Sequence, residues 1–159
     1  MNLILGIGSN LGERKQNIIA ACDLLERKLG KILAKSSIIE TKPWGFESND
    51  LFLNAVIVIE TDKTPLEALE ICFQIERNLG RVRSNATTYQ SRTIDLDILF
   101  CDDVIMSSNR LTIPHPLIIY RDFVLTPLKE IVPNFVHPVL KRKISDLELV
   151  SNEIPSDKP

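Results

Sequence analysis

The residues of this chain best suited to chemistry are two carboxylates, Asp95 and Asp97. The stretch from Asp95 to Phe100 begins with polar and apolar residues in alternation and is rich in β-forming residues, which predicts a strand. Alternation places Asp95 and Asp97 on one face of that strand and Leu96, Ile98 and Phe100 on the other. Two residues of strand rise separate the carboxylates by roughly 7 Å.

Two like charges at that distance favour a bound cation. At an effective dielectric constant near 20 they repel each other by about 2 kcal/mol. Divalent cations turn this repulsion into attraction, and Mg²⁺ is commonly held by one or two carboxylates together with phosphate oxygens. A solvated polar strand start is the simpler alternative for an Asp-x-Asp pair taken alone. The surrounding residues therefore decide between the two interpretations.

Basic residues surround the pair in a chain whose formal net charge is −2. The residues concerned are Arg81, Arg83, Arg92, Arg110, His115 and Arg121. Arginine donates paired hydrogen bonds to phosphate oxygens, and carboxylates supply Mg²⁺ ligands. Together they suit a nucleoside triphosphate, so the combination favours phosphoryl-type transfer.

The elements that position these residues alternate between strands and helices. Periodicity predicts strands at 3–7, 36–41, 51–60 and 95–100, and helices at 13–29 and 64–79. The second helix begins with a capping box, Thr64-Pro65-Leu66-Glu67. The order βαββαβ predicts an α+β, ferredoxin-like core with an antiparallel or mixed sheet. Extra elements follow on the C-terminal side, a hairpin over 104–113 and a short helix over 118–128.

Glycines follow the first predicted strand in the stretch Gly6-Ile7-Gly8-Ser9-Asn10-Leu11-Gly12. A dinucleotide-binding fingerprint requires its third glycine where Leu11 stands, so that interpretation fails. The glycines and Asn10 predict a tight turn from strand to helix. The polar stretch 81–92 has no period and predicts a loop that leads into the Asp95 strand.

Two polar residues interrupt faces that are otherwise apolar. Asn54 shares a strand face with Phe52 and Val56, and it either bonds neighbouring backbone or uses its amide to bind a polar heterocycle. Glu76 points to the apolar side of its helix, where a carboxylate needs a partner. A structural ion pair with Arg81 or Arg83 is the simpler interpretation of Glu76.

Composition limits the class of protein. The chain has 159 residues, of which 44% are hydrophobic and 25% charged, and this is typical of one globular domain. We expect a single domain over 1–150 and a disordered tail over 151–159. The slightly acidic balance argues against nucleic-acid and anionic-membrane partners. Three cysteines without a CxxC pair suggest core packing and a reducing, cytoplasmic location. We expect a monomer.

Six stretches, taken in chain order, carry a resemblance to a known family. They are Gly8-Ser9-Asn10-Leu11-Gly12, Lys42-Pro43-Trp44-Gly45-Phe46, Phe52-Leu53-Asn54-Ala55, Gly80-Arg81-Val82-Arg83, Arg92-Thr93-Ile94-Asp95-Leu96-Asp97-Ile98-Leu99 and Leu111-Thr112-Ile113-Pro114-His115-Pro116. They resemble the 6-hydroxymethyl-7,8-dihydropterin pyrophosphokinases, and the likeness extends to about Pro138. The Arg-Thr-x-Asp-Leu-Asp-Ile-Leu stretch is the most specific of the six.

The resemblance implies a reaction and a set of site residues. It implies transfer of diphosphate from ATP to the hydroxymethyl oxygen of the pterin, with release of AMP, in folate biosynthesis. Catalytic roles would fall to Arg81, Arg92, Asp95 and Asp97, and Asp95 and Asp97 would bind two Mg²⁺ ions. ATP would contact Glu76, Arg81, Arg83, Arg92, Arg110, Thr112, His115 and Arg121. The reduced hydroxymethylpterin would contact Thr41, Pro43, Trp44, Phe52, Asn54, Tyr89 and Phe123, with Phe52 and Phe123 stacking on its two faces.

The chain departs from the family pattern before Arg92. The usual Arg-Trp-Gly-Pro-Arg is replaced by Thr88-Tyr89-Gln90-Ser91-Arg92, so Tyr89 keeps an aromatic side chain but the Gly-Pro bend is absent. Two other classes compete with an enzyme. Ferredoxin-like sheets also bind RNA, but the first and fourth predicted strands lack the aromatic RNA-binding motif. A nucleotide-binding regulator without turnover is the remaining alternative.

Overall fold

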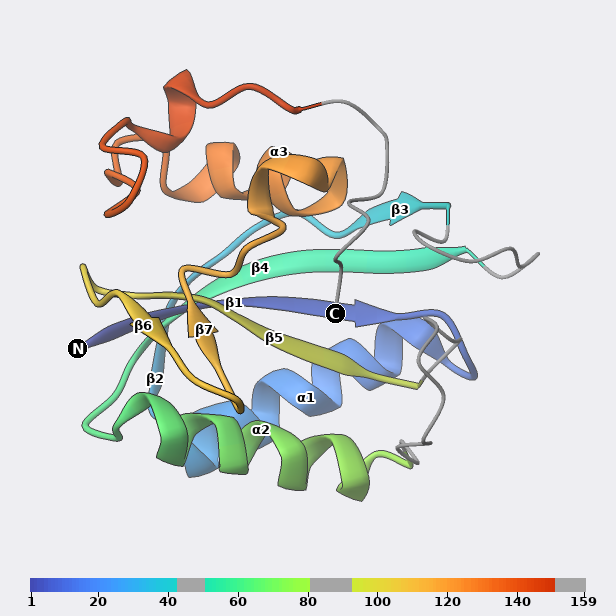
Figure 1. Cartoon of the computed structure of the whole chain (residues 1–159). Helices are drawn as coiled ribbons and strands as arrows, with labels where there is room; N and C mark the ends of the chain where they lie inside the picture. Colours follow the sequence, from blue (N-terminus) through green and yellow to red (C-terminus); the bar gives the residue numbers. More distant parts are fainter. Residues whose placement is uncertain (43–50, 81–92, 151–159) are drawn as a thin grey trace.

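A five-stranded antiparallel sheet forms the middle layer of the protein in the computed structural model, which describes residues 1–42, 51–80 and 93–150 (Figure 1). The strand order is β2-β4-β1-β5, and β3 pairs with β4 beyond the end of β2. The strands are β1 (Asn2–Ser9), β2 (Lys31–Lys35), β3 (Ile39–Thr41), β4 (Phe52–Glu60) and β5 (Asp95–Cys101). All neighbouring pairs are antiparallel, so the predicted ferredoxin-like α+β core is confirmed.

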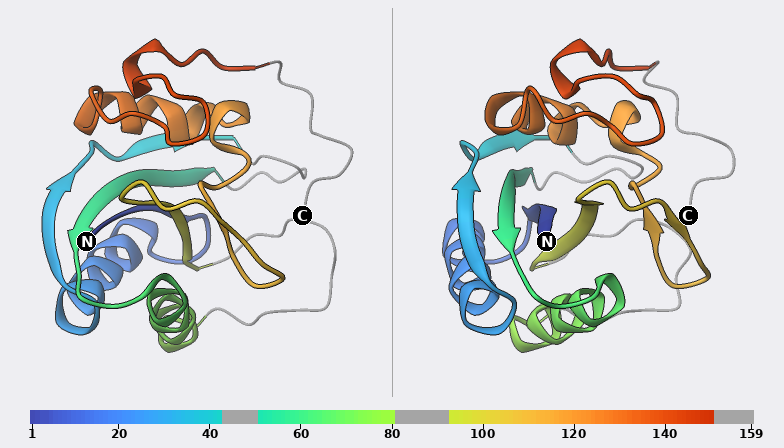
Figure 2. Two further views of the ribbon diagram at one scale, coloured as in Figure 1. Left: turned by 60° about the vertical axis from the view of Figure 1, so that its left-hand side comes forward. Right: turned by 90° about the vertical axis from the view of Figure 1, so that its left-hand side faces the viewer.

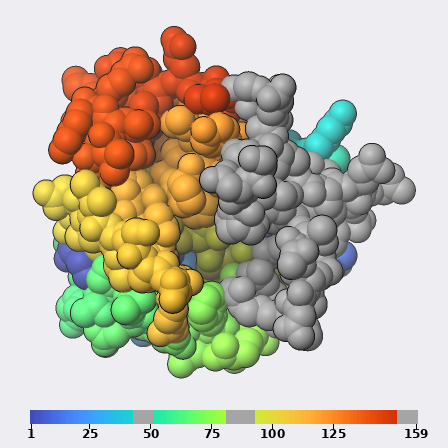
Figure 3. Space-filling view, viewed as in Figure 1, coloured from blue at the N-terminus to red at the C-terminus, as the bar shows by residue number. Residues whose placement is uncertain are grey.

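Helices cover both faces of the sheet (Figures 1 and 2). Helices α1 (Arg14–Lys28) and α2 (Pro65–Asn78) pack on one face. The other face carries α3 (Asp122–Ile131) with the 3₁₀ turns η1 (Ile118–Tyr120) and η2 (Ile144–Asp146). The hairpin of β6 (Met106–Ser107) and β7 (Thr112–Ile113) stands beside β5, as predicted, between the α2 side and the C-terminal layer in the space-filling view (Figure 3).

The start of α2 follows its sequence signal. The Thr64 hydroxyl accepts a hydrogen bond from the Glu67 N–H at 3.2 Å, and the Glu67 carboxylate accepts one from the Thr64 N–H at 3.1 Å. Each bond satisfies a backbone donor that the helix itself leaves without an acceptor. The predicted capping box is therefore confirmed.

The structure corrects the prediction for the first glycines. Strand β1 runs to Ser9, so Gly6 and Gly8 lie inside the strand instead of in the turn that follows it. The turn itself uses Gly12, whose φ of +69° lies in the region that only glycine adopts readily. The turn prediction is therefore wrong for Gly6 and Gly8 and correct for Gly12.

Strand β5 contains a β-bulge that alters the predicted faces. Leu5 of β1 pairs with Ile98, whereas the preceding Ile4 pairs with Phe100, so Leu99 is an extra residue in β5. Leu96 and Ile98 lie on the face opposite Asp95 and Asp97, as predicted, and pack toward α1 and α2. The bulge turns Phe100 to the opposite face, where it is fully buried under α3.

Two further boundaries differ from the sequence prediction. The edge strand β2 was not predicted, and β3 is shorter than the predicted strand at 36–41. The predicted helix over 118–128 is divided into η1 and α3, because Arg121 has extended backbone angles of φ −123° and ψ 106°. This interruption directs Arg121 toward the sheet.

Candidate active site

Antiparallel pairing places three of the predicted site residues, Asn54, Asp95 and Asp97, on the face of the sheet that carries α3. Gly8 of β1 pairs with Asn54 on one side and with Asp95 on the other. Residues opposite each other in antiparallel strands share a face, so Asn54, Gly8 and Asp95 form one cross-strand row. In the next row, Gly6 lies between Val56 and Asp97. Strand β1 thus carries no side chain between the amide and the two carboxylates.

The amide of Asn54 lies close against this bare strand. A Cβ atom added to Gly8 would lie 2.9 Å from Asn54 Oδ1 and 3.6 Å from the Phe52 ring. The Asn54 amide N–H donates a hydrogen bond of 2.7 Å to the Thr41 hydroxyl. Asn54 is only 6% exposed, and this hydrogen bond goes to a side chain and not to neighbouring backbone, one of the two alternatives that the sequence left open. Gly8 was missed as a site residue, although its spacing from Gly6 already placed both glycines on one strand face.

Arg121 brings a buried cation to the carboxylates. Its Nη1 lies 3.6 Å from Asp97 Oδ2, and the Arg121 side chain is 5% exposed while that of Asp97 is 34% exposed. The guanidinium carbon lies 5.7 Å from the centre of the Phe123 ring. Arg121, Asp97 and Phe123, three residues that the sequence predicted separately, are therefore neighbours.

His115 lies half-buried beside these charges. Its Nδ1 accepts a hydrogen bond of 3.1 Å from the Leu117 N–H, so the proton of the neutral ring is assigned to Nε2. Burial and, to a smaller extent, the nearby Arg121 lower the pKa of His115, Asp95 opposes them, and the net result is a pKa of about 4. The ring is therefore neutral at physiological pH and offers one N–H donor.

Glu76 is buried under β5 instead of facing the open side of the sheet. It is 1% exposed, and its Oε2 accepts a hydrogen bond of 2.9 Å from the N–H of Leu96, the residue between the two aspartates. This bond ties the carboxylate-bearing strand to α2. The expected contact of Glu76 with ATP stays a prediction, and its possible partners Arg81 and Arg83 lie outside the described residues.

Two predicted nucleotide-binding residues lie on the β6–β7 hairpin. Arg110 and Thr112 are both exposed, and Arg110 forms an ion pair with Glu70 of α2. The hairpin connects back to β5 through the His115 N–H, which donates to the Leu99 carbonyl at 2.9 Å. Arg110 and Thr112 are thus held on the α2 side of β5, apart from the Asn54 row.

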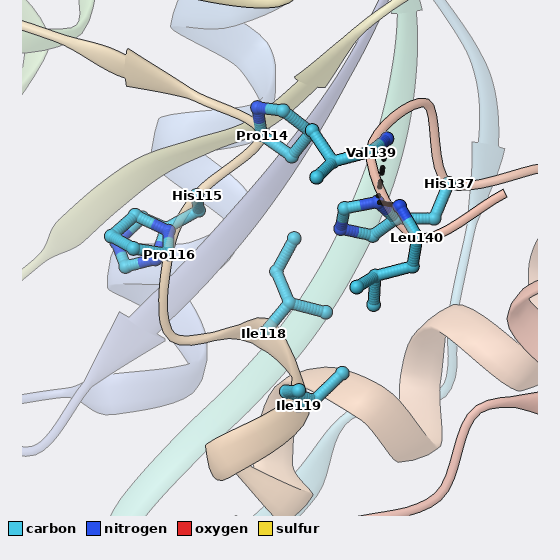
Figure 4. A pocket seen from close by; sticks show the side chains of 8 residues that line it. All are labelled: Pro114, His115, Pro116, Ile118, Ile119, His137, Val139 and Leu140. Atoms are coloured by element: carbon cyan, nitrogen blue, oxygen red, sulfur yellow. Dashed lines mark hydrogen bonds between the residues drawn. The ribbon is translucent and has the colours of Figure 1, made fainter. Parts of the chain in front are cut away.

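A pocket of about 190 Å³ adjoins the segment that carries His115 (Figure 4). Its walls are mostly apolar and come from residues 114–119 and from the C-terminal segment 137–140. His137 Nδ1 accepts hydrogen bonds from the N–H groups of Val139 and Leu140 and so shapes one wall. Its ring also meets Phe100 edge-on at 5.3 Å. The C-terminal segment therefore packs against the same region that positions His115.

The remaining predicted site residues, Arg81, Arg83, Arg92, Pro43, Trp44 and Tyr89, lie outside the described residues. Within the described ranges no group of three or more His, Cys, Asp or Glu side chains comes together to hold a metal. Asp95 and Asp97 are half-buried and would supply two carboxylate ligands. This set fits Mg²⁺, which usually completes its coordination with phosphate oxygens and water.

Comparison with known proteins decides the family. The sequence pattern of 7,8-dihydro-6-hydroxymethylpterin-pyrophosphokinase (HPPK) matches residues 4–133. The chain belongs to the HPPK family. It is therefore an enzyme, a diphosphotransferase that acts on hydroxymethyldihydropterin in folate synthesis. The resemblance seen in the sequence is confirmed.

Relatives of this HPPK chain come from distant organisms. The 2-amino-4-hydroxy-6-hydroxymethyldihydropteridine pyrophosphokinase of Porphyromonas gingivalis is 43% identical over 136 residues, which cover 84% of this chain and 92% of the relative. The enzyme of the same name from Methylorubrum extorquens is 41% identical, with 83% of each chain covered. Among solved structures, Plasmodium falciparum HPPK-DHPS has the same fold, with a TM-score of 0.72 at 19% identity. That match covers 92% of this chain but only 40% of the Plasmodium chain.

Within the described residues, none of the HPPK helices combines the length and the apolar character needed to cross a bilayer. The three cysteines are free and buried, as predicted. Burial raises the pKa of the Cys72 thiol to about 12, with Glu76 and Asp97 adding to the shift. Cys72 is therefore a protonated core residue.

The bond between Glu76 and Leu96 can be tested by removing the acceptor. We expect Glu76→Leu to lower the free energy of unfolding by about 1–3 kcal/mol more than Glu76→Gln, because only glutamine keeps an oxygen for the buried Leu96 N–H. Urea unfolding measures the difference, and hydrogen exchange at the Leu96 amide locates it. Equal stabilities and equal exchange rates for the two variants would contradict this role.

The neutral state of His115 makes stability depend on pH. As pH falls from about 6.5 to about 4, the unfolded chain binds a proton at His115 that the folded protein does not bind, so the stability falls over this window. We expect His115 to account for a loss of about 3 kcal/mol, most of it absent in His115→Gln. Urea unfolding at several pH values measures it.

His137, whose pKa is also lowered by burial, contributes in the same direction in both proteins. The difference between wild type and His115→Gln therefore isolates His115. Parallel pH curves for the two proteins would contradict the assignment.

Proposed function

We propose that this chain transfers diphosphate from ATP to the hydroxymethyl oxygen of 6-hydroxymethyl-7,8-dihydropterin and releases AMP, with two Mg²⁺ ions bound by Asp95 and Asp97. One observation carries the residue assignment. The row Asn54, Gly8 and Asp95 places an amide and a carboxylate on either side of a strand that has no side chain there. Such a row suits a flat substrate whose ring is bound at one end and whose reacting arm lies at the other.

The dimensions of the row support this placement. Strands β4 and β5 are separated by two inter-strand spacings, about 10 Å. This is comparable with the long axis of a two-ring heterocycle that carries a one-carbon arm. We assign Asn54 and Thr41 to the ring edge, because the amide and the hydroxyl together offer donors and acceptors. Phe52 and Phe123 would stack on the ring faces, and Pro43, Trp44 and Tyr89 would complete the pterin contacts.

The nucleotide side of the site is built from cations. Arg121 is held beside Asp97, where it would neutralise phosphate charge next to the metal ligands. His115 would donate its Nε2–H to an ATP oxygen, because its Nδ1 is already occupied. Arg110 and Thr112 extend this side along the hairpin, and Glu76 is assigned to the nucleotide side through the strand that it holds. Arg81, Arg83 and Arg92 stay predicted ATP ligands, and Arg81 and Arg92 stay predicted catalytic residues.

Charge neutralisation and positioning are the main tasks of such a site. The hydroxymethyl oxygen forms a bond with the β-phosphorus while the β-phosphorus loses its bond to the oxygen that bridges it to the α-phosphorus. AMP departs with that bridging oxygen, and the hydroxyl proton is released. Mg²⁺ bound at Asp95 and Asp97 would supply charge stabilisation at the phosphate oxygens.

Three further assignments belong to the same proposal. We assign a single pyrophosphokinase domain to 1–150, with 151–159 as a tail. We also assign a monomer without nucleic-acid or membrane partners. A reducing, cytoplasmic location is supported by the three free, buried thiols.

The transfer is tested by product analysis together with a metal-ligand variant. With ATP, Mg²⁺ and the reduced pterin, we expect AMP and pterin diphosphate to appear in equal amounts. Asp95→Asn should lower kcat by at least about 100-fold, because it removes a charged metal ligand. Its thermal stability should stay close to that of wild type, since the Asp95 side chain is only half-buried and lies outside the apolar core.

Asp103→Asn is the control, because it removes an exposed carboxylate just beyond the other end of β5. It should keep wild-type activity. Formation of ADP with a pterin monophosphate would refute the proposed reaction. Normal activity of Asp95→Asn at saturating Mg²⁺ would refute the metal assignment alone.

Two glycine variants test the pterin end of the row. We expect Gly8→Ala to weaken pterin binding at least about tenfold, because the new methyl group forces Asn54 Oδ1 to move and so costs a hydrogen bond. Gly6→Ala is the matched control, since its methyl group would lie 3.7 Å from the Leu99 side chain, an ordinary contact. Calorimetric titration with pterin measures both, and equal affinities would contradict the role of Asn54 in this position.

A further inference from the structure

The Gly8-Ser9-Asn10 stretch contains a hydroxyl that the proposed reaction does not use. Ser9 is fully buried, and its hydroxyl donates a hydrogen bond of 2.5 Å to the backbone carbonyl of Thr93. Thr93 lies two residues before Asp95, at the entrance to β5. A residue at the end of the central strand thus contacts the chain just before the first proposed metal ligand.

A second side chain reaches the same carbonyl from another element. Asn17 of α1 donates from Nδ2 to the Thr93 carbonyl at 3.2 Å and to the Leu11 carbonyl at 3.0 Å. The same nitrogen lies 3.4 Å from the Ser9 hydroxyl. The Thr93 carbonyl therefore accepts two side-chain hydrogen bonds from residues more than 70 positions earlier in the chain.

The position of Asp95 explains why such an anchor matters. Asp95 is the first residue of β5, and its pairing with Gly8 is the last rung of the ladder between β1 and β5. The end of an edge strand frays readily, because few backbone bonds hold it. The backbone hydrogen bonds between β1 and β5 end before Thr93, whereas the side chains of Ser9 and Asn17 bond directly to the Thr93 carbonyl.

We propose that Ser9 and Asn17 are positioning residues of the diphosphate transfer, which act by fixing the Thr93 carbonyl and thereby the place of Asp95 on the sheet. This inference rests on the proposed role of Asp95. Reacting groups must be held closely, and a displacement of about 1 Å can cost on the order of 100-fold in rate. Neither side chain needs to touch substrate for its loss to slow the reaction.

The test compares Ser9→Ala and Asn17→Ala with a matched control, Thr61→Val. The Thr61 hydroxyl also donates a buried hydrogen bond to a backbone carbonyl, that of Leu29, at 2.7 Å. Thr61 follows the end of β4 where β1 begins, at the opposite end of the sheet from Asp95. Loss of this bond should lower thermal stability in the same way as Ser9→Ala does, without reaching the site.

We expect Ser9→Ala to lower kcat at least about tenfold and to raise the Mg²⁺ concentration needed for half-maximal rate, with the KM for pterin within about twofold of wild type. Asn17→Ala should give a smaller change in the same direction and keeps the test valid if Ser9→Ala folds poorly. Thr61→Val should keep wild-type kcat and Mg²⁺ dependence.

The proposal is overturned if both anchor variants keep kcat and Mg²⁺ dependence within about twofold of Thr61→Val. It is also overturned if Thr61→Val loses as much activity as they do. Asp95→Asn is measured in parallel to separate the two levels of inference. An active Asp95→Asn refutes the metal assignment, whereas an inactive Asp95→Asn with normal Ser9→Ala and Asn17→Ala refutes the anchor alone.

Discussion

The site depends on one close approach, that of the Asn54 amide to strand β1 at Gly8. A methyl group on Gly8 would lie 2.9 Å from Asn54 Oδ1, and the other end of the amide is bonded to Thr41. The amide is thus confined from both sides. Because Asn54, Gly8 and Asp95 occupy one row, the spacing of the strands fixes the separation of the two ends of the site. A sheet provides this spacing more rigidly than loops do.

Strand β5 has two tasks along its length. Its first half must present carboxylates on the open part of one face, while its second half must fill the core beneath α3. The bulge at Leu99 adds Phe100 to the core that Leu99 also fills, and the regular pairing of Asp95 and Asp97 with β1 is unaffected. The Phe100 ring is held there by edge-on contacts with Phe135 and His137. The carboxylates of Asp95 and Asp97 therefore lie on a strand whose other end is held in the core.

Charge in the site is fixed before any substrate binds. The Arg121 side chain is nearly inaccessible to solvent and presents its positive charge to Asp97. Burial and this same cation keep His115 neutral down to about pH 4. Among the described residues, the site thus pairs the Arg121 cation with the neutral donor His115, and this division suits phosphate oxygens near neutral pH.

Sequence alone determined the βαββαβ order of the core, the capping box of α2 and the shared face of Asp95 and Asp97. These features follow from side-chain periodicity and from bonds between residues close in the chain. Tertiary structure decided the placement of Gly8, the bulge at Leu99, the break at Arg121 and the hydrogen bond from Ser9 to Thr93. Each of these depends on a contact between segments far apart in sequence, for which no local pattern carries a signal. The period-two spacing of Gly6 and Gly8 was visible in the sequence. Only strand pairing revealed that the Asn54 amide lies where a side chain at position 8 would be.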